Sequence, residues 1–107
     1  MAYHALMEFK ETPFFTRQIR SFSDEEYRLL QQLLIIRPDA GKLIQGSGGC
    51  RKMRWGIKGK GKSGGARVIY YWDSGAGIYM LYLYEKADQA DLTPMQIATL
   101  KRTIEQG

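Results

Sequence analysis

Basic side chains and glycines gather in one quarter of the sequence, between Lys42 and Arg67. This segment holds eight Lys or Arg residues, eight glycines and no acidic residue, whereas the whole chain has 16 basic and 11 acidic residues. Clustered cations bind phosphate groups and stabilise anions that form during a reaction, and glycines let a backbone approach a ligand closely. The segment therefore indicates a phosphate-bearing partner such as a nucleic acid.

Strand periodicity places several of these cations on one surface. In the strand expected over Cys50–Ile57, the apolar residues alternate, which leaves Lys52 and Arg54 together on the opposite face. Arg67 opens the next strand-forming run, and Lys86 follows the last one. If the three strands are neighbours, five side chains converge in a cationic pocket that contains a phenol: Lys52, Arg54, Arg67, Tyr84 and Lys86.

The elements that must position these residues form an α+β pattern. Apolar spacing and capping residues predict two N-terminal helices and one C-terminal helix: Thr12–Arg20, Ser23–Arg37 and a last one from Thr93. Alternating apolar, β-branched and aromatic residues predict the strands: Tyr3–Phe9, Cys50–Ile57, Ala66–Asp73 and Gly77–Glu85. Asp39–Gly49 is expected to be a loop, and the glycine-rich Ser74–Gly77 to close an antiparallel hairpin. We expect a single small domain over residues 1–107 with an antiparallel-rich sheet.

A glycine- and lysine-rich stretch lies between the first two of the three later strands. Gly56–Ser63 has the G-x-x-x-x-G-K-S spacing of a phosphate-binding loop, but that loop needs a helix after it, and Ala66–Tyr71 is strongly strand-forming. Two interpretations remain, a solvated hairpin loop or a mobile basic loop that follows a phosphate backbone. We favour the second, which gives four candidates for phosphate contact: Arg51, Lys58, Lys60 and Lys62.

The chain length and the remaining composition limit the number of domains and the kinds of site that are possible. A chain of 107 residues with 44% hydrophobic residues can bury one core but cannot form a multi-domain enzyme. Cys50 is the only cysteine, expected to be small and buried, and His4 is the only histidine, so an internal disulfide and a usual Cys/His zinc site are excluded. No apolar run approaches the ~18 residues that cross a bilayer, and we expect a cytoplasmic protein.

Four stretches of the sequence form a recurring signature. They are IQGSGGCRKMRW at 44–55, GKGKSGGARVIYY at 59–71, LYEK at 83–86 and DLT at 91–93. Together they resemble the RelE/HigB-type toxins of bacterial type II toxin–antitoxin systems, and specifically the HigB-like branch. The similarity runs from residue 44 to the last helix, and the order of the elements before it is compatible.

The resemblance implies a RelE-like fold and a toxin that enters the ribosomal A site, cuts translated messenger RNA and so inhibits translation, without a metal or other cofactor. It also implies a cognate antitoxin of the helix-turn-helix type, encoded adjacently. Lys52, Arg54, Arg67 and Lys86 match basic positions of the family. The RelE branch also has a catalytic tyrosine where this chain has Ala90, Asp91 and Leu92, and Tyr84 is the substitute that we consider.

Cutting RNA through the neighbouring 2′-hydroxyl requires removal of a proton, stabilisation of an anionic phosphorane and protonation of the leaving 5′-oxygen. The hypothesis assigns the phosphorane charge to Arg67, the leaving group or the phosphate to Lys86, and the first proton transfer to Lys52 or Tyr84. The candidates for phosphate contact would then bind the ribosome or the message. A non-catalytic RNA- or DNA-binding module and a catalytically decayed relative are alternatives that the sequence leaves open.

Overall fold

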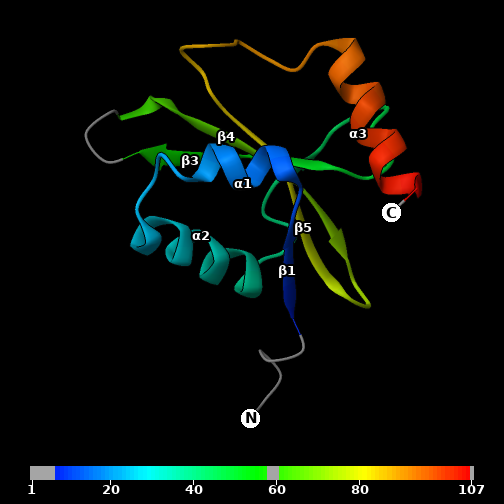
Figure 1. Ribbon diagram of the computed structural model, residues 1–107, viewed down its shortest axis with the longest axis horizontal. Coiled ribbons are helices and arrows are strands. Elements are labelled where there is room, and N and C mark those ends of the chain that lie inside the picture. Colours follow the sequence, from blue (N-terminus) through cyan, green and yellow to red (C-terminus); the bar gives the residue numbers. More distant parts are fainter. Residues whose placement is uncertain (1–6, 58–60, 107) are drawn as a thin grey trace.

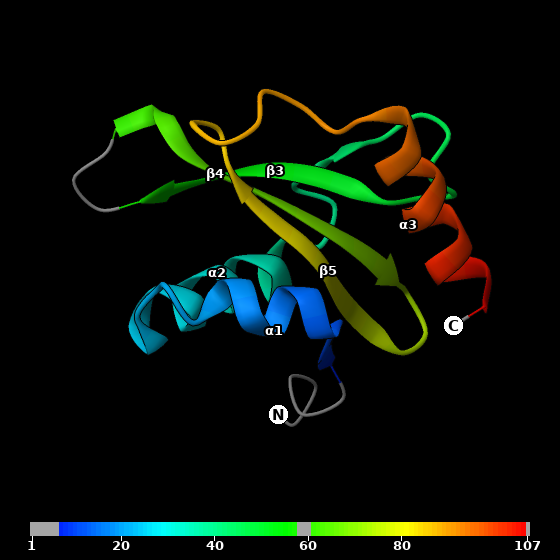
Figure 2. The ribbon, with the colours of Figure 1, turned by 45° about the horizontal axis from the view of Figure 1, so that its top comes forward.

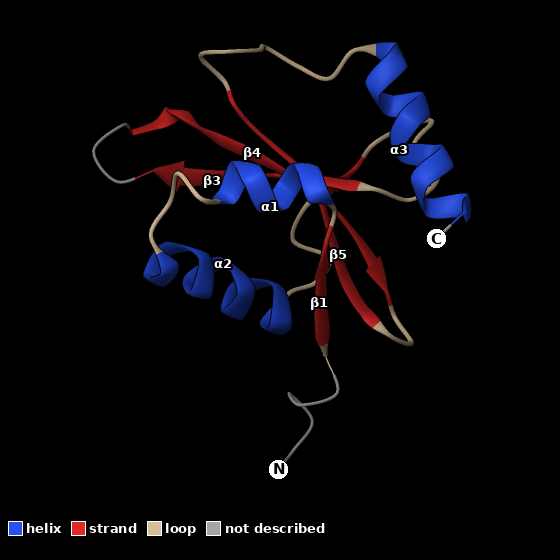
Figure 3. Cartoon of the chain, viewed as in Figure 1, coloured by secondary structure: helices blue, strands red, loops and turns tan. Residues whose placement is uncertain are grey.

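The computed structural model describes residues 7–57 and 61–106, which form a sheet with helices on both sides (Figures 1 and 3). The helices are α1 (Pro13–Ile19), α2 (Asp24–Ile36) and α3 (Pro94–Gln106). The strands are β1 (Glu8–Glu11), β2 (Lys42–Leu43), β3 (Arg51–Ile57), β4 (Gly61–Asp73) and β5 (Gly77–Glu85). The predicted α+β class, with two N-terminal helices, an antiparallel-rich sheet and a C-terminal helix, is confirmed.

The five strands follow the order β1-β5-β4-β3-β2, and only the β1–β5 pair is parallel. β1 pairs with Gly77–Met80 and reaches no further along β5. The start of α1 continues the contact with this edge, because the backbone N–H of Thr12 donates to the Met80 carbonyl and its hydroxyl to the Leu81 carbonyl. The later part of β5 therefore has an edge that none of the five described strands covers.

Local signals at the helix ends agree with the prediction. Ser23 caps α2, its hydroxyl accepting from the backbone N–H of Glu26 while the Glu26 carboxylate accepts from the backbone N–H of Ser23. This reciprocal pair satisfies two donors that a helix start leaves open. Thr12 caps α1, its hydroxyl accepting from the backbone N–H of Phe15, with Pro13 in the first turn of the helix. Sequence and structure thus agree on where both N-terminal helices begin.

The helices divide between the two faces of the sheet (Figure 2). On one face, Phe15 of α1 and Leu30 and Leu34 of α2 pack on β4 and β5 around Val68 and Tyr70. On the other face, a smaller cluster joins α3 to the same strands: Cys50, Ile69, Leu81, Tyr84 and Leu100. The sheet is thus the middle layer of three.

A bulge in β5 decides which side chains share a face. Ile69 pairs with Tyr82 and Tyr70 with Met80, so Leu81 is an extra residue in the ladder. One extra residue reverses the alternation of every later side chain in the strand. As a result, Tyr82 and Tyr84 lie on the α3 face together with Ile69, whereas Leu83 packs on the opposite face.

The structure corrects three predicted boundaries. The strand expected over Tyr3–Phe9 is β1 at Glu8–Glu11, and residues 1–6 lie outside the described part of the chain. The expected loop over Asp39–Gly49 contains the two-residue β2, which pairs with Arg51 and Lys52. β4 begins at Gly61 rather than Ala66, because the glycine-rich segment pairs back on Ile57. Since a strand and not a helix begins there, the phosphate-binding loop is excluded as predicted.

No helix within residues 7–57 and 61–106 has the length and apolar character that a membrane crossing needs.

Candidate active site

The site is built on a transverse row of three residues from three neighbouring strands. Arg54 of β3 pairs with Arg67 of β4, and Arg67 pairs with Tyr84 of β5. Directly paired residues of antiparallel strands have their Cβ atoms roughly 4.5–5.5 Å apart on one face of the sheet. The predicted convergence of these side chains is therefore what the strand register produces, and we call the three residues the Arg54–Arg67–Tyr84 row.

Lys52 lies one step further along the same face. It pairs with Ile69, two residues from Arg67, while Met53 and Trp55 pack on the opposite face, under α1 and α2. The alternation that predicted Lys52 and Arg54 on a common face thus holds in β3. Four of the five side chains expected to converge share one surface: Lys52, Arg54, Arg67 and Tyr84.

Arg67 is the most unusual member of the row because it is buried. Its side chain is only 8% exposed, and its one hydrogen bond among the described residues is a 3.4 Å contact from Nη1 to the Ala66 carbonyl. No ion pair within the described part of the chain includes Arg67. A buried cation without a paired carboxylate costs stability, so the presence of Arg67 in the otherwise apolar and aromatic run Ala66–Trp72 indicates a function.

Tyr84 presents the row with a buried phenol. The residue is 6% exposed, and its hydroxyl has no hydrogen-bond partner among the described residues. Burial raises the pKa of the Tyr84 phenol above 10.0, the negative charge of Asp91 adds to the rise, and Arg67 opposes it. The phenol is therefore protonated at neutral pH and can donate a hydrogen bond to an anion that enters the site.

Asp91 is a site residue that the sequence analysis named within the DLT stretch and as a departure from the RelE branch, without giving it a role. Its carboxylate accepts from Lys52 Nζ at 3.0 Å and from the backbone N–H of Leu92 at 2.8 Å. These two hydrogen bonds, the one from Lys52 first, lower the pKa of Asp91 below 3.8, with the charges of Lys52 and Arg67 adding to the effect. Asp91 is thus ionised at neutral pH and holds the Lys52 ammonium over the sheet.

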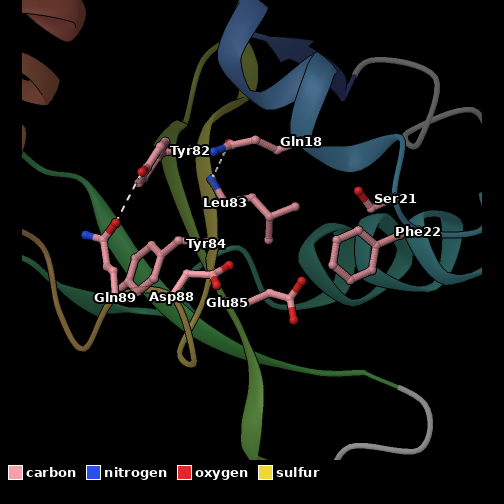
Figure 4. Close-up of a pocket in the computed structure, with 9 residues that line it drawn as sticks. All are labelled: Gln18, Ser21, Phe22, Tyr82, Leu83, Tyr84, Glu85, Asp88 and Gln89. Atoms are coloured by element: carbon pink, nitrogen blue, oxygen red, sulfur yellow. Dashed lines mark hydrogen bonds between the residues drawn. The ribbon is translucent and has the colours of Figure 1, made fainter.

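The segment that carries Asp91 is fixed by a polar network. The Gln89 side chain donates to the Asp91 carbonyl and to the Gln96 side chain, and accepts from the Tyr82 hydroxyl (Figure 4). Gln96 in turn forms a capping box with Thr93 at the start of α3. Hydrogen bonds that connect a loop to a strand and a helix give it a defined position, so Asp91 is placed over the cationic face by β5 and α3 together.

Two of the remaining predicted residues, Lys86 and Arg51, do not join the row. Lys86 is exposed after β5, where its backbone N–H donates to the Gly65 carbonyl. Arg51 lies on the opposite face from Lys52, and its guanidinium donates to the carbonyls of Asp39 and Gly41. Lys58 and Lys60 lie outside the described residues, as does His4, and the Lys62 side chain is likewise not described.

Among residues 7–57 and 61–106, no group of three or more His, Cys, Asp or Glu side chains is placed to hold a metal ion. Lys52, Arg54 and Arg67 contribute positive charge at this point of the face. The arrangement is suited to holding a phosphate and to stabilising an anion that forms on it.

Two comparisons relate this chain to known proteins. A family model described as "RelE toxin of RelE / RelB toxin-antitoxin system" matches residues 9–106. Among solved structures, the chain is similar to the E. coli toxin RelE, in a mutant with two arginines replaced by alanine, in the free state. The TM-score is 0.58 with 10% sequence identity, and the match covers 92% of this chain and 97% of that one. At this identity the structural likeness concerns the fold alone.

Proposed function

This chain belongs to the RelE toxin family of the RelE/RelB toxin–antitoxin system, and on that premise we propose that it is a ribosome-dependent endoribonuclease that cuts translated messenger RNA in the A site. The predicted toxin family, RelE-like fold and function as a translation-inhibiting ribonuclease are confirmed at this level. The HigB-like branch remains part of the proposal. The observation that supports the proposed site best is the buried Arg67 between Arg54 and Tyr84, which has no ion pair among the described residues.

The proposed reaction is transfer of the phosphate to the neighbouring ribose oxygen. The 2′-oxygen loses its proton and attacks phosphorus, the bond from phosphorus to the 5′-oxygen breaks, and that oxygen takes up a proton. The products are a 2′,3′-cyclic phosphate and a free 5′-hydroxyl. Charge builds up on the phosphorane oxygens between these steps, so fixed cations near them lower the barrier.

The residues of the site divide these tasks. Arg67 holds the phosphorane charge, with Arg54 next to it, and Lys86 binds the phosphate or protonates the leaving oxygen. The first proton transfer falls to Lys52 or Tyr84, and Asp91 positions Lys52 through the 3.0 Å ion pair. Because the pKa of Tyr84 is raised, a base role for Tyr84 predicts a cleavage rate that still increases above pH 10, and Tyr84→Phe would remove that increase.

We further propose that cleavage needs no metal ion, because the cations of the site supply the positive charge that the phosphorane requires. Membership of the RelE family also implies a cognate antitoxin, which we propose to be a helix-turn-helix protein encoded adjacently. The ribosome and the message are the other expected partners. We propose that four residues contact their phosphate groups: Arg51, Lys58, Lys60 and Lys62. A cytoplasmic location and a single domain over residues 1–107 belong to the same proposal.

The proposed function is tested by adding the purified protein to a cell-free translation reaction and mapping new message ends. We expect cuts only when ribosomes translate the message. We also expect the same cleavage rate when a chelator has removed divalent ions from the isolated toxin before the toxin is added. Cuts in free RNA would contradict the ribosome dependence, and loss of cutting after chelation would contradict the metal independence. Tight RNA binding without any cut would favour a non-catalytic binding module.

A further inference from the structure

The loop between β5 and α3 brings a negative charge onto the cationic face. Residues 86–93 form no helix or strand, and they lie on the same side of the sheet as α3 (Figure 2). The loop places the Asp91 carboxylate 3.0 Å from the Lys52 ammonium, on the face where Arg54 and Arg67 also lie. The face to which we assign the message phosphate thus already holds an anion that belongs to the protein itself.

The contacts of Asp91 are of the kind that a phosphate oxygen makes. One carboxylate oxygen, Oδ1, accepts both from Lys52 Nζ and from the backbone N–H of Leu92, at 3.0 and 2.8 Å. Lysine ammonium groups and backbone N–H groups are also common donors to the phosphates of nucleic acids. Asp91 therefore occupies donors that a phosphate of the message would otherwise use.

The charge of Asp91 also acts on the Arg54–Arg67–Tyr84 row. Besides its ion pair with Lys52, the carboxylate interacts electrostatically with Arg67 and with Tyr84. A phosphate that binds at Arg67 is therefore repelled by this carboxylate more strongly than by distant surface charges, because repulsion falls with distance and with screening by salt. The affinity of the face for RNA is accordingly lower than its cations alone would give.

We propose that Asp91 is a specificity-determining residue, which stands in for a substrate phosphate beside Lys52 and so restrains the binding of RNA outside the ribosome. The proposal rests on the proposed function, because it concerns the same phosphate site. A message held on the ribosome next to the toxin presents its phosphate at a high effective concentration, which overcomes the repulsion. That phosphate can share Lys52 with Asp91, since an ammonium group has three N–H donors. Free RNA lacks the advantage in concentration and meets the same repulsion.

The test measures, without ribosomes, the binding of a short 2′-O-methyl RNA, which lacks the attacking hydroxyl, to the isolated toxin by fluorescence anisotropy. Asp91→Asn keeps an oxygen that can accept from Lys52 and Leu92 but removes the negative charge. We expect this variant to bind the RNA at least about fivefold more tightly, the effect of one unit charge at about 4 Å in water. The slope of log affinity against log salt concentration should steepen by up to about 0.7, because one more cation becomes available to the RNA phosphates.

Asp88→Asn is the matched control, because it removes the same charge from the same loop. Asp88 is exposed, lines a pocket at the edge of β5 (Figure 4) and forms no ion pair among the described residues. Its RNA affinity should stay within about twofold of wild type. Equal tightening by the two variants would show a general effect of net charge, and unchanged or weaker binding by Asp91→Asn would show no restraint. Either result would overturn the proposal.

A double-mutant cycle tests whether the restraint acts through Lys52. Lys52→Ala should weaken RNA binding about fivefold more in the Asp91→Asn background than in the wild type, because only there is the ammonium released from its carboxylate. Equal losses in both backgrounds would overturn the proposal. The proposed function has a separate test, since absence of cleavage on ribosomes would overturn it, whereas the affinities for free RNA measure the restraint without any cleavage.

Discussion

The two faces of the sheet differ in what covers them and in what they bury. Among the described residues buried under α1 and α2, the side chains are apolar apart from the Tyr70 hydroxyl, which accepts from the Gly41 N–H and donates to the Pro38 carbonyl. On the α3 face, two buried side chains lack a partner among the described residues. Arg67 has no ion pair there, and the Tyr84 hydroxyl has no hydrogen bond.

This difference separates the residues that fold the chain from those that act. A satisfied apolar face contributes stability by removing surface from water, whereas a buried cation and an unpartnered phenol cost stability unless a ligand satisfies them. Residues of the α1–α2 face should therefore affect unfolding, and residues of the Arg54–Arg67–Tyr84 row should affect cleavage.

The largest effect is expected on cleavage, from Arg67→Ala. Removing the guanidinium to which we assign the phosphorane charge should lower the cleavage rate by about 10²–10³-fold, the effect of deleting one group that stabilises a developing anion. The melting temperature should not fall, because the substitution removes a buried unpaired cation. Single-turnover cleavage on ribosomes measures the first effect, with Arg28→Ala on the exposed side of α2 as the charge-matched control. Activity within about threefold of wild type would contradict the role of Arg67.

The next effect concerns the opposite face, in Leu34→Ala. Leu34 is fully buried in the cluster with Phe15 and Tyr70, and truncation should reduce the free energy of unfolding by about 2–5 kcal/mol. Urea denaturation measures the change. Leu29→Ala, at a 56% exposed position of the same helix, should change stability by no more than ~0.5 kcal/mol. Equal effects of the two substitutions would show that α2 does not pack as described.

A smaller effect is expected from Tyr70→Phe. The Tyr70 hydroxyl is the partner of the Gly41 N–H at 2.8 Å and of the Pro38 carbonyl at 2.7 Å. Its loss leaves both groups without that partner, which should cost about 1–3 kcal/mol of unfolding free energy. Tyr71→Phe, the half-buried neighbour on the other face, is the control for losing a tyrosine hydroxyl. Equal midpoints of urea unfolding for the two variants would contradict the bridging role of Tyr70.

The smallest effect concerns the Cys50 thiol. Burial raises its pKa from 9.0 to about 11, with a hydrogen bond to Ser47 opposing the rise. Alkylation of the folded protein should therefore be slow at pH 8 and should accelerate only toward pH 11. Because the folded state favours the protonated thiol, its contribution to stability is complete below about pH 9 and is lost as the pH rises through 11. Rapid labelling at pH 8 under native conditions would contradict the burial of Cys50.

Several features of the fold and of the candidate site could be predicted from the sequence, because their signals are local. The capping box at Ser23 and the hairpin before Gly77 fixed element boundaries, because each depends on residues within a few positions of one another. The shared face of Lys52 and Arg54 followed from strand alternation in the same way. These predictions needed no knowledge of which strands are neighbours.

Other features depend on contacts between distant segments and left no such signal. The bulge at Leu81 lies in a run that is apolar or aromatic at every position, so alternation cannot reveal an extra residue there. Asp91 reaches Lys52 across 39 positions, through a segment fixed by Gln89. A single aspartate before a predicted helix start does not indicate such a contact, and only the folded arrangement brings it to the site.

The most direct test of the separation between the two faces measures stability and cleavage on the same preparations of wild type, Arg67→Ala and Leu34→Ala. We predict that Arg67→Ala keeps its melting temperature and loses cleavage, while Leu34→Ala melts earlier and, below its transition, cleaves within about threefold of wild type. If Arg67→Ala unfolded early in proportion to its lost activity, the row would serve the fold rather than the reaction, and the account would be contradicted.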